Sequence, residues 1–137
     1  MSRDEALEEL QRRADAIEGG YELMLAYAAQ GLVSDEGAAN SSQLRDHLKR
    51  FDAALTGLPQ VYREAAKALE VWPTEAFEGL LKTLEADATF TQSALRMALG
   101  QPGISSQLID NINASIHVRA LLTDVFVIDE LLRGAKT

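Results

Sequence analysis

The chain has 137 residues, of which 47% are hydrophobic and 25% charged, so it is long enough for one self-sufficient domain and unlike a disordered chain. Its formal net charge is -8 at pH 7, which repels the phosphates of nucleic acid and of anionic membranes. It contains no cysteine, which excludes disulfides, thiolate catalysis and cysteine-ligated metals. We therefore expect a single domain over residues 1–137 that binds neither nucleic acid nor membranes.

The N-terminal residues are charged and contain no apolar stretch of the kind found in a signal peptide. No apolar run approaches the roughly 20 residues that a helix needs to cross a bilayer. Together with the absence of cysteine, these features favour a cytoplasmic protein.

Residues 4–32 predict the first helix. Apolar positions recur there at alternating intervals of three and four, at Leu7, Leu10, Ala14, Ile17, Tyr21, Met24 and Ala28. This heptad pattern is typical of a long helix packed along its length. Gly19 and Gly20 interrupt the pattern and predict either a kink or a close contact with another helix.

A loop rich in glycine, serine and aspartate precedes the second predicted helix. Asn40, with Gln43 three residues later, has the form of a capping box at a helix start. The apolar spacing then passes through Gly57 and Pro59 without losing phase, which favours one kinked helix over residues 41–70. Two helices that meet at Pro59 are the alternative, because proline also fits the first turn of a helix.

The third helix is expected to begin after Trp72 and Pro73, and to end at Gly100 with Pro102 just beyond. Its apolar seam is Phe77, Leu81, Leu84, Ala88, Thr91, Leu95 and Ala98. Small and polar residues weaken this seam in the middle.

The fourth helix is expected to begin near Ser105 and to run to about residue 133. At about 100° per residue, the apolar residues before His117 and those after it point to nearly opposite sides of a helix. The helix therefore either breaks near His117 or has a second half that is covered on more than one side.

Four helices of this length predict an all-α fold, specifically an antiparallel four-helix bundle with up-down-up-down topology. Residues 41–48 also resemble residues 105–112, and both segments begin with Ser-Ser-Gln-Leu at an expected helix start. Two related αα-hairpins would explain the match, but so would the common use of serine at helix starts.

The sequence contains little that points to catalysis. Di-iron bundles use Glu-x-x-His on two helices, whereas here Leu44 precedes His47 by three residues and Ala114 precedes His117. Nucleotide-binding glycine loops and the Gly-x-Ser-x-Gly nucleophile motif are also absent. We therefore expect no catalytic residue, no cofactor and no metal site.

Histidine phosphotransfer domains are acidic four-helix bundles with an exposed histidine followed by basic residues, and the segment after His47 resembles them. Their pattern has an apolar residue at +2, lysine at +3 and a small residue at +4. Here these positions hold Lys49, Arg50 and Phe51, so the match is incomplete. His47, together with His117 in its polar stretch, is a candidate phosphoryl or small-ligand site.

Two sets of apolar residues exceed what a single-sided core needs. One is Leu23 and Tyr27, which lie off the seam of the first helix. The other, on the last helix, includes Leu121, Val125, Val127, Ile128 and Leu131. An exposed set of this kind marks an interface, so we expect a homodimer or a protein partner. The sequence thus favours a non-enzymatic interaction module, such as an adaptor or a small chaperone-like protein, although the chain's own neighbours could also bury these residues.

Overall fold

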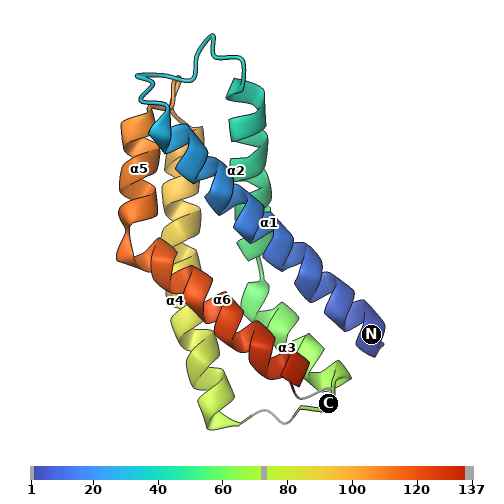
Figure 1. The fold of residues 1–137 in the computed structure, drawn as a ribbon. Helices are drawn as coiled ribbons and strands as arrows, with labels where there is room; N and C mark the ends of the chain where they lie inside the picture. The colour runs from blue at the N-terminus through green and yellow to red at the C-terminus, as the bar shows by residue number, and fades with distance from the viewer. Residues whose placement is uncertain (1, 72–73, 135–137) are drawn as a thin grey trace.

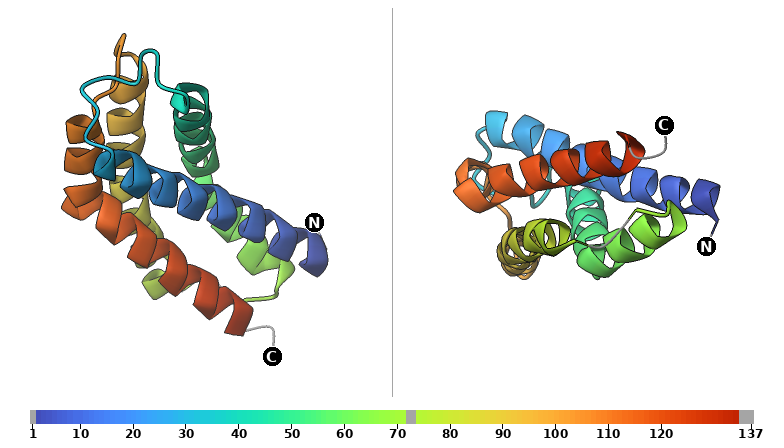
Figure 2. Two further views of the ribbon diagram at one scale, coloured as in Figure 1. Left: turned by 45° about the horizontal axis from the view of Figure 1, so that its top comes forward. Right: turned by 90° about the horizontal axis from the view of Figure 1, so that it is seen from below.

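The computed structural model describes residues 2–71 and 74–134, and over them the chain is all-helical, as predicted. The helices are α1 (Arg3–Ala29), α2 (Ser41–Leu55), α3 (Leu58–Ala68), α4 (Glu75–Leu99), α5 (Ser106–Ala114) and α6 (Ile116–Gly134). They form two layers, with α1, α5 and α6 in one and α2, α3 and α4 in the other (Figures 1 and 2). The expected boundary at Trp72 and Pro73 lies outside the described residues.

The core lies between the two layers, where α1 contacts α2 and α3 and α6 crosses α4. Every helix contributes buried apolar residues to it. Side-chain hydroxyls cap three of the helix starts, those of Ser2, Thr74 and Ser105. Helix α4 ends at Leu99 with Gly100 as its C-cap, as expected. Among the described helices, none is both long and apolar enough to cross a bilayer.

The predicted continuous helix over residues 41–70 is wrong, and the alternative of two helices is confirmed. Gly57 separates them with a φ of 66°, a left-handed conformation that glycine adopts without steric cost. Pro59 then lies in the first turn of α3. The guanidinium group of Arg13 on α1 donates to three carbonyl groups at the end of α2, those of Ala53, Ala54 and Thr56.

The capping box predicted at Asn40 is also wrong. Asn40 has φ -101° and ψ 11°, outside the extended region in which a side chain reaches back to the helix start. Its side-chain amide instead donates to Gln30, at 3.4 Å.

The helix break expected near His117 is confirmed, and it lies at Ser115. Ser115 has a ψ of 134°, so the chain leaves the helical conformation for one residue between α5 and α6. Its hydroxyl accepts the backbone N–H of His117 at 3.1 Å, which satisfies one of the free donors at the start of α6. The new helix can therefore take a different direction and cross α4 (Figure 1).

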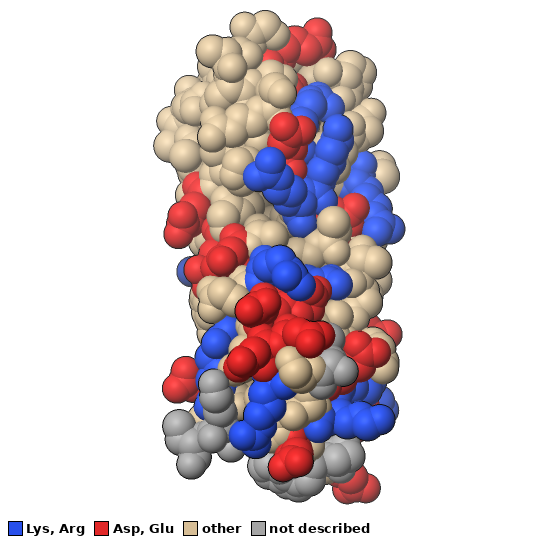
Figure 3. All heavy atoms as spheres, turned by 90° about the vertical axis from the view of Figure 1, so that its right-hand side faces the viewer, with Lys and Arg blue, Asp and Glu red and all other residues tan. Residues whose placement is uncertain are grey.

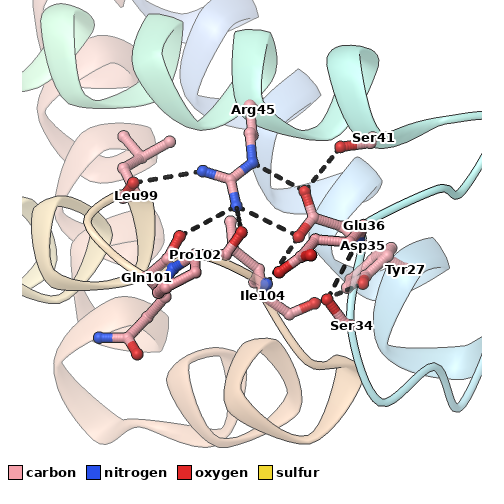
Figure 4. Close-up of polar contacts among 10 residues, drawn as sticks. All are labelled: Tyr27, Ser34, Asp35, Glu36, Ser41, Arg45, Leu99, Gln101, Pro102 and Ile104. Carbon is pink, nitrogen blue, oxygen red and sulfur yellow. Dashed lines mark hydrogen bonds and ion pairs between the residues drawn. The ribbon is translucent and has the colours of Figure 1, made fainter.

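A buried ion pair joins the two long loops at one end of the molecule (Figure 4). Asp35, in the loop before α2, accepts hydrogen bonds from Arg45 at 2.7 Å and from the backbone N–H of Ile104 at 2.6 Å. Arg45 also donates to carbonyl groups after α4, those of Leu99, Gln101 and Pro102. The hydrogen bonds from Arg45 hold the pKa of the Asp35 carboxyl well below its usual value, so this ion pair persists at all but strongly acidic pH.

Gly20 marks the closest approach of α1 to α2, as one of the two predictions for Gly19-Gly20 expected. A Cβ atom built on Gly20 would lie 2.7 Å from Cδ2 and 2.9 Å from Cβ of Phe51. The Phe51 Cβ is fixed to the α2 backbone, so a rotation of the ring does not relieve the clash. Gly19, one residue earlier, has no such neighbour within 4 Å.

We therefore predict that Gly20→Ala lowers the free energy of unfolding by about 1–3 kcal/mol, because the core is already full at that point. Gly19→Ala is the matched control and raises it by up to about 1 kcal/mol, because alanine is the better helix former. Urea unfolding monitored by circular dichroism measures both. Equal effects of the two substitutions would contradict the close contact.

Candidate functional site

The contact between α4 and α6 brings together a histidine, two aspartates and several exposed apolar side chains. Along α4, residues that recur at intervals of three and four share the side that faces α6: Leu80, Thr83, Asp87, Phe90 and Ala94. Along α6, the facing residues are His117, Ala120, Asp124, Val127 and Leu131. We call the exposed part of these two sets the seam surface.

His117 and Asp87 form the polar centre of the seam surface. Nδ1 of His117 lies 3.1 Å from Oδ1 of Asp87, whose side chain is only 10% exposed. Since a carboxylate can only accept, Nδ1 carries the proton and Nε2 is left free on a ring that is half exposed. Phe90 lies beside this ring, with the two ring centroids 4.7 Å apart.

Asp124 approaches Asp87 from the other helix. Burial raises the pKa of the Asp124 carboxyl to about 7, and the neighbouring Asp87 carboxyl adds to the shift. Within the described residues, no N–H or O–H group donates to Oδ2 of Asp124, although this atom is buried. The two adjacent carboxyl groups therefore share one proton below about pH 7, and this proton is not assigned to one residue alone.

His117, Asp87 and Asp124 thus form a short polar chain that connects solvent to the interior of the seam. Such a chain can hold a proton or receive a cation. In the part of the structure described, no three histidine, aspartate or glutamate side chains converge as they would around a metal ion.

Apolar side chains flank this polar centre on both helices. Leu131 and Leu80 line one shallow hollow near the end of α6, and both are exposed. Val127 lies one helical turn from Asp124 and is 43% exposed, and Leu131 is 54% exposed. The seam surface therefore combines exposed apolar side chains with a partly buried acid pair.

Of the predicted interface residues, Val127 and Leu131 lie on the seam surface and Leu23 is half-buried on α1. The expectation of surface exposure is wrong for the other four, because they belong to the core: Tyr27, Leu121, Val125 and Ile128. Ser115 turns α6 so that three of these, Leu121, Val125 and Ile128, face the interior.

Tyr27 is buried because it lies three residues after Met24, on the same side of α1. The buried positions after Ile17 are Gly20, Met24 and Tyr27, whereas Tyr21 and Ala28 of the predicted seam are only partly buried. The Tyr27 hydroxyl donates to the carbonyl of Ile104 at 2.6 Å, so this side chain ties α1 to the loop after α4.

The two candidate histidines lie on different helices in different layers, His47 on α2 and His117 on α6. Nδ1 of His47 lies 3.0 Å from the backbone oxygen of Gln43 on the same helix. The sequence interpretation missed Asp87 and Phe90, which lie about 30 residues before His117. A signal was available, since Asp87 is a charged residue next to Ala88 on the weak middle of the predicted apolar seam.

No protein-family model, curated protein or solved structure matches this chain. The function is therefore argued from the seam surface itself.

We predict that the stability of the wild-type chain falls as the pH rises from about 4 to about 7, since the folded Asp124 carboxyl holds a proton that the unfolded chain releases in this range. Asp124→Asn removes this dependence, so relative to wild type the variant gains thermal stability between about pH 5 and about pH 8. Melting temperatures from circular dichroism at the two pH values measure the gain. Asp110→Asn, at an exposed aspartate of α5, is the control and leaves the wild-type pH dependence unchanged. The same difference from wild type at both pH values for Asp124→Asn would exclude a proton held at this site.

Proposed function

We propose that this chain is a protein-interaction module that docks its partner on the seam surface. The observation that carries the proposal is the distribution of exposed apolar side chains. Seven of the nine large ones among the described residues belong to α4 or α6: Leu80, Phe90, Met97, Ile116, Phe126, Val127 and Leu131. Four of these seven, Leu80, Phe90, Val127 and Leu131, belong to the seam surface, whereas Phe126 lies with Tyr21 and Leu25 of α1. Exposed apolar side chains that gather along two neighbouring helices are typical of a site that another protein covers.

Another face of the molecule carries more charged side chains. On the side formed by α1, α2 and α3, Lys and Arg side chains lie among Asp and Glu side chains over much of the face (Figure 3). Two ion pairs join this side to α4, one from Arg63 of α3 to Glu78 at 2.8 Å and one from Asp52 of α2 to Arg96 at 3.0 Å. Such a mixed, paired surface favours solubility over recognition. The contrast supports the side of α4 and α6 as the docking surface.

A library of displayed helical peptides, each of about 16 residues, tests the proposal without knowledge of the natural partner. We predict that peptides selected on the wild-type chain bind Val127→Glu at least about tenfold more weakly, because a carboxylate would then be buried without a partner at the centre of the contact. Val127 is 43% exposed, so the substitution leaves the core intact. Fluorescence anisotropy with labelled peptides measures the affinities.

Gln60→Glu, which adds the same charge at an exposed position of α3, is the matched control and retains the wild-type affinity. Selected peptides that bind Val127→Glu as well as wild type would place the docking surface elsewhere. Light scattering of the purified chain shows in addition whether a second copy occupies the surface, because Val127→Glu would then convert a dimer to a monomer.

Phosphoryl transfer through His47 is a second candidate function, and one observation favours it. The Gln43 carbonyl next to Nδ1 fixes the proton on that nitrogen, which leaves Nε2 as the nucleophile for a phosphoryl group. Phe51, at +4, is fully buried against α1 and therefore does not occupy the surface beside the histidine.

We predict on this second proposal that the chain, incubated with a phosphorylated histidine kinase or response regulator, acquires an acid-labile phosphoryl group. His47→Gln abolishes this labelling, whereas His117→Gln leaves it unchanged because that ring lies on a different helix. Gel analysis with radiolabelled phosphate reads out both variants. Equal labelling of wild type and His47→Gln, or no labelling of any form, would remove this candidate.

A further inference from the structure

The side of α4 that faces α6 differs in charge from the rest of that helix. Apart from the contact of Asp87 with His117, the ion pairs of α4 go to helices of its own layer, since Glu78 binds Arg63 of α3 and Arg96 binds Asp52 of α2. From Leu80 to Ala94, the only charged residue on the side that faces α6 is Asp87.

Helix α6 shows the same division. Its C-terminal ion pair, Asp129 with Arg133, points toward α1, where Arg133 also donates to Gln11 at 3.1 Å. Among the residues of α6 on the side that faces α4, Asp124 is the only one with a carboxyl group, and His117 is the only other titratable group. The seam surface thus contains two carboxyl groups and no Lys or Arg within the residues that define it.

The missing counter-charge indicates what a partner should supply. Elsewhere in the described chain, the buried carboxylate of Asp35 receives a guanidinium group and a backbone N–H, which together satisfy it. Asp87 receives the half-exposed His117 ring and the proton that it shares with Asp124, and no N–H group of the described residues donates to Oδ2 of Asp124. A carboxyl pair that is incompletely satisfied and surrounded by exposed apolar side chains is complementary to a cation carried on an apolar surface.

We propose that the partner of this module inserts a Lys or Arg side chain beside Asp87 and Asp124, flanked by apolar side chains that cover Phe90, Val127 and Leu131. This inference rests on the proposed docking function and specifies the chemistry of the partner. The incoming cation takes the place of the proton that the two carboxyl groups share, so binding transfers that proton from the Asp87–Asp124 pair to the buffer. The apolar contacts supply affinity, and the charge pair fixes which partner segment fits.

The selected peptides described above test the inference through their composition. We expect sequences with a Lys or Arg three or four residues from apolar positions to be enriched on wild type. This enrichment should disappear when the same library is selected on the double variant Asp87→Asn/Asp124→Asn. Because an acidic protein attracts basic peptides in general, the control is Glu8→Gln/Glu64→Gln, which removes two exposed carboxylates from α1 and α3 and keeps the enrichment.

One enriched peptide then allows a direct measurement by titration calorimetry. Replacing its Arg by citrulline, which has the same shape without the charge, should weaken binding to wild type at least about tenfold and leave binding to Asp87→Asn/Asp124→Asn unchanged. Calorimetry in two buffers of different ionisation enthalpy should show release of about one proton at about pH 6 with the Arg peptide, and none with the citrulline peptide.

The outcomes separate the two proposals. Peptides that bind, that Val127→Glu weakens, and that lack an enriched Lys or Arg would overturn this inference and leave the docking function standing. Equal affinities of the Arg and citrulline peptides for wild type would overturn it as well. If no peptide depends on Val127, the docking function itself fails, and this inference fails with it.

Discussion

The packing of α6 across α4 determines what this protein presents to its surroundings, and two carboxyl groups lie at the centre of that contact. Burial and the neighbouring Asp87 carboxyl raise the pKa of Asp124 to about 7, so the contact keeps a proton up to about neutral pH. An apolar pair of side chains at these positions would give a more stable contact. Local departures of this kind from the rules for stability are common at functional sites.

Stability is provided elsewhere in the molecule. The Asp35–Arg45 ion pair ties the loop before α2 to the segment after α4, and each nitrogen and oxygen of the pair has at least one partner (Figure 4). Gly20 allows α1 and α2 to approach closely, while Ser115 ends α5 and caps α6. Together these features orient α6 so that one side completes the core and the other meets solvent beside α4. Our account of function depends on that orientation.

The sequence predicted the all-helical class and most of the helix ends, because apolar periodicity and the residues at helix ends are local signals. It did not predict the division of residues 41–70, since Gly57 interrupts the helix without disturbing the spacing of the apolar residues. Nor did it predict the burial of Tyr27, which lies three residues after Met24 and shares the packed side of α1 with it. The candidate site was found only in part. His117 was singled out, but its pairing with Asp87 and Phe90 depends on which helices meet, and no local pattern encodes that.

Carbon-13 NMR of the side-chain carboxyl groups, followed as a function of pH, tests the central claim most directly. If α4 and α6 hold Asp87 and Asp124 together as described, the Asp124 carboxyl titrates with a pKa of about 7, and the Nδ1–H resonance of His117 responds to that titration. If instead the Asp124 carboxyl titrates near about 4, as exposed aspartates do, it shares no proton with Asp87 and the contact between α4 and α6 is not built as we describe.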